Sequence, residues 1–156
     1  MSFRAKYEAL LQGIVDDADK IAMHYFRSDE IGAERKSDGT VVTIADKTVE
    51  ALALRKVAES GLPIHVVGEE TSKEPPSEPA RDGRPRMIID PIDGTEEFSR
   101  GIPTFGTLIG IEEDGEIVAG IVSAPALSQG TRAFRFPSSA SWAPLRIPSR
   151  LEPARP

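Results

Sequence analysis

Cysteine is absent from this chain of 156 residues, which excludes disulfide bonds and thiolate metal ligands and fits a reducing cytoplasm. A membrane partner is not expected, because no apolar run approaches the length of a membrane span and no signal-peptide core follows the first residues. A basic excess is also lacking. The net charge is −6, so no nucleic-acid partner is expected.

Composition and charge divide the chain near Gly130. Apolar residues make up 39% and charged residues 28%, which is typical of a globular domain with a core rather than of a disordered chain. Residues 131–156 contain five Arg and one Glu, which gives +4 for this segment and −10 for the rest. Five prolines there argue against regular elements. The sequence predicts a domain over 1–130 and an irregular Pro/Arg-rich tail over 131–156.

Apolar periodicity predicts both helices and strands. Three-and-four spacing of apolar residues predicts amphipathic helices over residues 3–27 and 47–60. Shorter apolar runs predict strands, and these cover residues 62–67, 87–90, 104–111 and 116–122. Glu112-Glu113-Asp114-Gly115 between the last two is a hairpin signal. Neither histidine is expected to be a metal ligand. His24 lies near a helix end and is expected to be solvated or to interact with the helix dipole, and His65 within a strand is expected to be exposed or structural.

Residues 87–98, Met-Ile-Ile-Asp-Pro-Ile-Asp-Gly-Thr-Glu-Glu-Phe, form the stretch around which a site is expected. The apolar residues predict a short buried strand that ends at Asp90. Pro91 stiffens the exit from this strand, and Asp93 follows two residues later. Carboxylates at a strand end are the oxygen ligands that Mg²⁺ prefers. Asp-Pro and Asp-Gly are also ordinary turn chemistry, so this stretch alone leaves both interpretations open.

The chain beyond Asp93 is expected to turn into a short helix. Gly94 permits a tight turn, and Thr95 is expected to be the N-cap of a helical segment over residues 96–100. Backbone N–H groups at a helix start favour an anion such as phosphate.

Two other segments supply carboxylates. Glu69 and Glu70 follow the strand predicted over residues 62–67, and Asp46 follows a short apolar run over 41–45. The stronger interpretation of Asp46 from its pattern is a helix cap, which does not exclude a second role. Strands lying side by side would gather these acids at one edge of a sheet, where two divalent metals could activate a water.

The same residues resemble a known family. Gly68-Glu69-Glu70, Asp90-Pro91-Ile92-Asp93-Gly94-Thr95 and Lys36 with Val42-Thr43-Ile44-Ala45-Asp46 look like the three N-terminal motifs of the inositol monophosphatase superfamily. The resemblance covers roughly residues 5–130. It implies an α+β fold, the N-terminal half of a layered sandwich with helices packed on a mainly antiparallel sheet. The family's C-terminal domain, with a further metal-binding aspartate, is expected to be absent here.

The resemblance also implies roles for individual residues. The metal ligands are expected to be Glu69, Asp90 bridging two Mg²⁺ ions, the backbone carbonyl of Ile92, and Asp93. Thr95 paired with Asp46 would orient the attacking water, and Glu70 would assist catalysis behind the direct ligands or at a third, weaker metal. The N–H groups of Gly94 and Thr95 would hold the phosphate, and Lys36 matches a family lysine with an electrostatic role.

The implied activity is direct hydrolysis of a small phosphorylated alcohol. Residues 36–40, 104–109 and 122–127 look most like histidinol-phosphate phosphatases, which would place the protein in histidine biosynthesis. Inositol monophosphatase is the first alternative, and a nucleotide or sugar-bisphosphate phosphatase is another.

The alternative of another class is an inactive truncated fragment that at most binds metal. The change of composition after residue 130 suggests truncation or a frame shift. A site open on one side is expected to have a weakened second metal and little turnover. The exposed sheet would favour a homodimer or aggregation.

Overall fold

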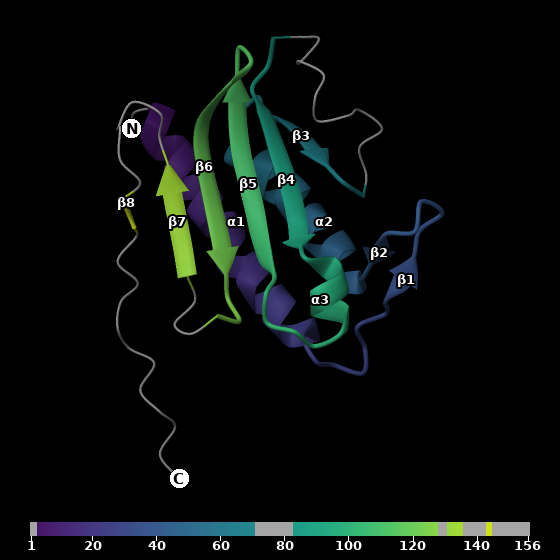
Figure 1. The fold of residues 1–156 in the computed structure, drawn as a ribbon. Coiled ribbons are helices and arrows are strands. Elements are labelled where there is room, and N and C mark those ends of the chain that lie inside the picture. Colours follow the sequence, from purple (N-terminus) through teal and green to yellow (C-terminus); the bar gives the residue numbers. More distant parts are fainter. Residues whose placement is uncertain (1–2, 71–82, 128–130, 136–142, 145–156) are drawn as a thin grey trace.

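The computed structural model describes residues 3–70, 83–127, 131–135 and 143–144 (Figure 1). The elements follow one another as α1 (Phe3–Tyr25), β1 (Glu34–Arg35), β2 (Val41–Val42), α2 (Ile44–Ser60), β3 (His65–Gly68), β4 (Arg86–Asp93), α3 (Thr95–Ser99), β5 (Gly106–Glu113), β6 (Glu116–Ala124), β7 (Thr131–Arg135) and β8 (Ala143–Pro144).

A six-stranded sheet forms the centre of the described structure, with its strands in the order β3-β4-β5-β6-β7-β8. The β3–β4 pair is parallel, and every other pair in this sheet is antiparallel. The turn at Asp114-Gly115 joins β5 to β6, as the hairpin signal predicts. The expected mainly antiparallel sheet is confirmed.

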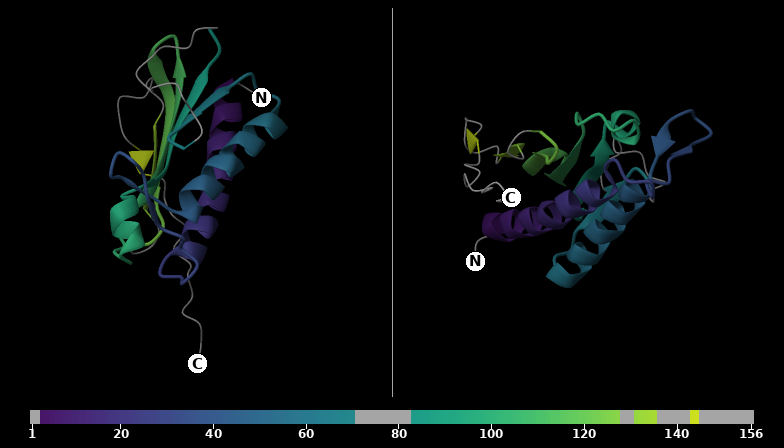
Figure 2. Two further views of the ribbon diagram at one scale, coloured as in Figure 1. Left: turned by 90° about the vertical axis from the view of Figure 1, so that its right-hand side faces the viewer. Right: turned by 90° about the horizontal axis from the view of Figure 1, so that it is seen from below.

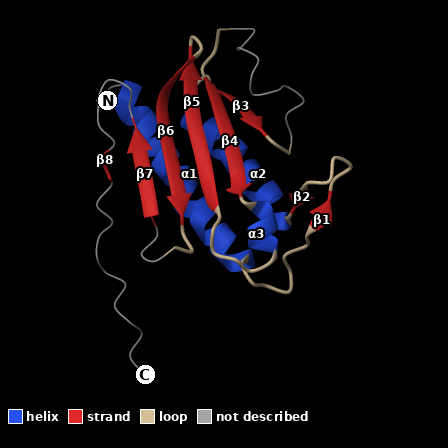
Figure 3. Ribbon diagram, viewed as in Figure 1, coloured by secondary structure: helices blue, strands red, loops and turns tan. Residues whose placement is uncertain are grey.

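Both long helices cover one face of this sheet (Figures 2 and 3). Helix α1 packs against β5 and β6, while α2 packs against β3 and β4. The largest core cluster joins the apolar faces of the helices to the inward side chains of the strands, with Leu11, Ile14, Met87 and Ile111 fully buried. Burial of this apolar area is the main favourable term in folding. None of the helices in the described residues is long and apolar enough to cross a membrane.

Several predicted boundaries are wrong by a few residues. Helix α2 starts at Ile44 with Thr43 as its N-cap, so the N-cap role expected for Asp46 is wrong. Asp46 instead lies in the first turn, where it accepts hydrogen bonds from the backbone N–H and hydroxyl of Thr43 at 2.7 Å and 2.6 Å. At α3 the N-cap is Gly94, and Thr95 is the first helical residue rather than the cap.

Strand β4 is longer than the sequence predicts. It continues through Asp90 and Pro91 to Asp93, because the register with β5 shifts between the two aspartates. A bulge of this kind accommodates a proline, which has no N–H to offer the ladder.

The C-terminal segment is not irregular throughout. Thr131–Arg135 pairs with β6 as strand β7, and Ala143–Pro144 pairs with β7. The expectation of irregular structure is therefore wrong for these residues, and the rest of the tail lies outside the described residues. The division into a domain over 1–130 and a tail stays a prediction.

Candidate active site

The parallel pairing of β3 with β4 places two acidic segments side by side. Gly68 pairs with Ile89, so Glu69, just beyond the end of β3, lies next to Asp90 of β4 in the direction of the two parallel strands. Two strands distant in the sequence thus deliver carboxylates to one place, as the sequence predicts.

The chain beyond Asp90 is held by a hydrogen bond from β5 and by apolar packing. The buried hydroxyl of Thr107 on β5 donates to the carbonyl of Pro91 at 2.8 Å. The side chain of Ile92 packs with Ala22, Phe98 and other residues in a second core cluster. The main chain between Asp90 and Asp93 is therefore held by a hydrogen bond at Pro91 and by the buried side chain of Ile92. Asp93, at the end of β4, is exposed.

The turn into α3 depends on glycine at position 94. Gly94 has φ +81°, and a Cβ there would lie 2.8 Å from the carbonyl oxygen of Thr104. Only glycine adopts this left-handed conformation readily, and the space for a side chain is missing as well. The tight turn predicted from the Asp-Gly pair is confirmed.

Asp46 and Thr95 come together across the site. The hydroxyl of Thr95 lies 2.7 Å from the carbonyl oxygen of Ile92 and 3.2 Å from Asp46 Oδ1. Asp46 is buried, with 2% of its surface exposed. Burial raises the pKa of its carboxyl, although the hydrogen bonds from Thr43 and Thr95 oppose the rise. The pairing that the resemblance implies is present, and its role with water stays a prediction.

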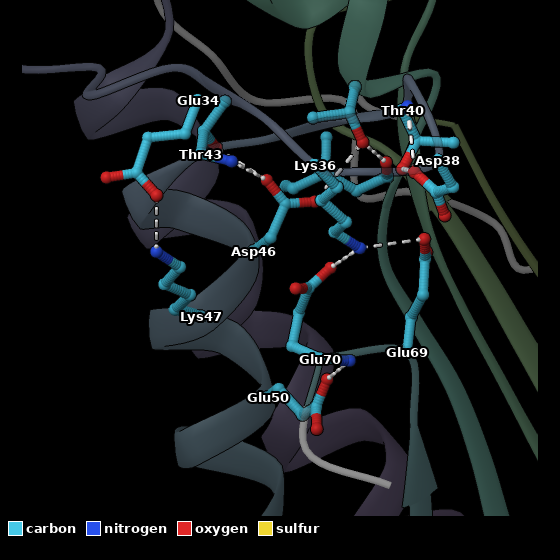
Figure 4. A network of polar contacts seen from close by, with 12 residues as sticks. Glu34, Lys36, Asp38, Thr40, Thr43, Asp46, Lys47, Glu50, Glu69 and Glu70 are labelled. Carbon is cyan, nitrogen blue, oxygen red and sulfur yellow. Dashed lines mark hydrogen bonds and ion pairs between the residues drawn. The ribbon is translucent and has the colours of Figure 1, made fainter. Parts of the chain in front are cut away.

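Lys36, from the β1–β2 hairpin, reaches the acidic edge, which we define as Glu69, Glu70, Asp90 and Asp93. Its Nζ donates to Glu70 Oε1 at 2.6 Å and to Glu69 Oε1 at 3.2 Å (Figure 4). Burial lowers the pKa of Lys36, but the hydrogen bonds to Glu70 and Glu69 outweigh it, so the pKa is raised overall. A cation therefore already lies between the two glutamates.

Asp90 has the most perturbed carboxyl of the site. Burial, followed by the charges of Asp93, Glu69 and other nearby acids, raises its pKa to about 6. Its Oδ1 is buried and has no hydrogen-bond partner among the described residues. An unpaired buried carboxylate oxygen is costly unless a cation binds it. The position therefore fits a divalent metal, whose hard oxygen ligands are the groups found here.

The acids are near one another but are not arranged as a complete ligand set. Within the described residues, no group of three or more His, Cys, Asp or Glu has the spacing of a metal site. Lys36 explains part of this arrangement, because its ammonium group binds Glu69 and Glu70. The metal ligands named from the sequence remain predictions, supported by the environment of Asp90.

Sequence reasoning missed Glu50, a fully buried residue of α2. Its Oε2 accepts the backbone N–H of Glu70 at 2.8 Å (Figure 4). The available signal was a charged residue on the apolar face of the helix, next to Val49 and four residues after Asp46. A buried charge on such a face needs a specific partner.

Comparison with known proteins agrees with this fold. A profile of the inositol monophosphatase family matches residues 5–145. The histidinol-phosphatase of Chlorobaculum parvum is 34% identical over 122 residues, which is 78% of this chain and 45% of that protein. The histidinol-phosphatase of Streptomyces coelicolor is 38% identical over 120 residues, 74% of this chain and 43% of that protein.

A solved structure shares the fold. The Thermotoga maritima IMPase TM1415 superimposes with a TM-score of 0.68 at 27% identity, covering 81% of this chain and 46% of that one. Both curated relatives are named as phosphatases, and the solved structure is named as an IMPase. The chain belongs to the inositol monophosphatase family. The chain spans less than half the length of these two curated relatives.

Proposed function

We propose that this chain carries the metal-binding half of a Mg²⁺-dependent phosphomonoesterase site. The observation that supports the proposal most is the buried, unpartnered Oδ1 of Asp90, next to acids from separate segments of the chain. Glu69, Asp90, Asp93 and the carbonyl of Ile92 would hold the metal. When bound there, Mg²⁺ would supply positive charge to activate a water and to stabilise the leaving oxygen of a phosphate ester.

The remaining residues position the reactants. Asp46 and Thr95 form a hydrogen-bonded pair that can orient a water and accept its proton, since Asp46 has a raised pKa. The N–H groups of Gly94 and Thr95 would hold phosphate oxygens. Lys36 would balance the negative charge of the two glutamates and steer an anionic substrate towards the edge.

The proposed substrate is histidinol phosphate, because the two curated relatives described above are named histidinol-phosphatases. Inositol monophosphate is the alternative, supported by the structural likeness to an IMPase. A cytoplasmic location and a homodimer are part of the same proposal.

The competing proposal is a metal-binding fragment without turnover. It is favoured by the partial exposure of the site, since Glu69 and Asp93 are both exposed. Electrostatic stabilisation is greatest where water is excluded.

Release of inorganic phosphate separates these proposals. Wild type, Asp93→Asn and the control Asp114→Asn, an exposed residue of the β5–β6 turn, are compared on histidinol phosphate and inositol monophosphate with Mg²⁺. We expect faster release from histidinol phosphate, a loss on the order of 100-fold in Asp93→Asn, and no change in the control. Equal activity in Asp93→Asn would contradict the site. Metal binding without any release would support the fragment.

A further inference from the structure

Two buried carboxylates lie one turn apart on α2. Asp46 is 2% exposed and Glu50 is 0% exposed, and their spacing of four residues puts them on the same face of the helix. This face otherwise carries core residues such as Val49, Ala53 and Val57. Carboxyl side chains are rarely placed among core residues without specific partners, because removing them from water is costly.

Each of these carboxylates binds the turn that follows one of the two parallel strands. Asp46 Oδ1 accepts the hydroxyl of Thr95, beyond the end of β4. Glu50 Oε2 accepts the backbone N–H of Glu70, beyond the end of β3. Helix α2 therefore contacts the segments that follow both parallel strands.

Gly68 shows how closely Glu50 approaches the chain. A Cβ at position 68 would lie 2.1 Å from Cδ of Glu50 and 2.3 Å and 2.5 Å from its two carboxylate oxygens. Gly68 is not among the residues with positive φ, so its backbone conformation does not require glycine. The last residue of β3 is glycine because the Glu50 carboxylate occupies the space that a side chain at position 68 would need.

We infer that Glu50 is a positioning residue for the acidic edge. By accepting the Glu70 N–H beside Gly68, it fixes the turn after β3 so that Glu69 and Glu70 face Lys36 and Asp90. The inference that Glu50 affects metal binding rests on the proposed function, whereas the inference that Glu50 fixes the turn after β3 does not.

Amide hydrogen exchange of the metal-free chain tests the effect on the turn. Glu50→Ala removes the acceptor, Glu50→Gln keeps one carbonyl oxygen in its place, and Val57→Ala weakens the core contact of the same helix away from the turn. We expect exchange at the Glu70 amide to accelerate on the order of tenfold or more in Glu50→Ala beyond the change in global stability, and to stay near the wild-type rate in the other two. Unchanged exchange in Glu50→Ala would overturn the inference.

Titration with Mn²⁺, followed by the free-ion signal in electron paramagnetic resonance, tests the effect on the site. We expect a roughly tenfold or greater loss of affinity in Glu50→Ala, recovery in Glu50→Gln, and wild-type affinity in Val57→Ala. Gly68→Ala, which displaces the Glu50 carboxylate, should repeat the loss if Glu50→Ala does not fold. Equal losses in Val57→Ala would show a merely structural role and overturn the inference. Absence of Mn²⁺ binding by wild type would overturn the proposed function instead, and hydrogen exchange would still decide whether Glu50 holds the turn.

Discussion

Replacing Asp90 with Asn is expected to stabilise the metal-free chain at pH 8. Burial and neighbouring acids raise the pKa of Asp90 from 3.8 to about 6 in the folded state. The native state therefore binds more protons than the unfolded state between these values, and the free energy of unfolding falls as the pH rises from about 4 to above 6. An uncharged Asn removes this penalty.

The size of the effect follows from the shift. About two pKa units correspond to about 3 kcal/mol, and partial exposure of the side chain reduces this to about 1–2 kcal/mol through solvent screening. For a chain of this length, a gain of that size raises the melting temperature by about 2–8 °C.

Thermal unfolding followed by circular dichroism, with a chelator present, measures the gain at pH 4 and pH 8. The gain should appear at pH 8 and nearly vanish at pH 4, and the control Asp114→Asn at the exposed turn should behave as wild type at both. The reasoning is refuted if Asp90→Asn is less stable than wild type at pH 8. It is also refuted if the gain does not depend on pH.

Three further substitutions test other parts of the site. Gly94→Ala should lower the free energy of unfolding by about 1–3 kcal/mol in a denaturant titration, because of its positive φ and the nearby carbonyl of Thr104; no loss would contradict the close approach. Thr95→Val removes the hydroxyl that bonds Asp46, so phosphate release should fall about tenfold or more while stability changes by only about 1 kcal/mol; unchanged release would exclude the role with water. Lys36→Met removes the cation that pairs with Glu69 and Glu70. Because bound Mg²⁺ would also offset the charge of these acids, the melting temperature at pH 8 should fall more without Mg²⁺ than with it. Equal falls would contradict the placement of Lys36 and Mg²⁺ at the same acidic residues.

Local sequence patterns predict most of this fold for physical reasons. Apolar periodicity identifies both long helices, and the acidic turn before Gly115 identifies the β5–β6 hairpin, because these signals depend on neighbouring residues. The start of α2 is less well predicted. Thr43 and Asp46 both suit a helix start, and only the hydrogen bonds of the folded chain show that Thr43 is the cap.

Long-range packing explains what the sequence pattern misses. Pairing with β6 makes a strand of Thr131–Arg135, although this segment has no strand pattern that stands out from the Pro/Arg-rich surroundings. The hydrogen bond from the Glu70 N–H to Glu50 forms only when α2 lies against the end of β3. The contact of Lys36 with Glu69 and Glu70 likewise requires the β1–β2 hairpin to fold over the sheet edge.

Anomalous diffraction from crystals soaked in Mn²⁺ tests the central claim most directly. We expect a peak at the end of β4, bonded to Asp90 Oδ1, a carboxylate oxygen of Glu69 and the carbonyl oxygen of Ile92, with Lys36 withdrawn from Glu69. The same crystals of Asp90→Asn should show no peak there. A peak that persists in Asp90→Asn, or wild-type crystals without a peak at this edge, would contradict a metal site built on Asp90.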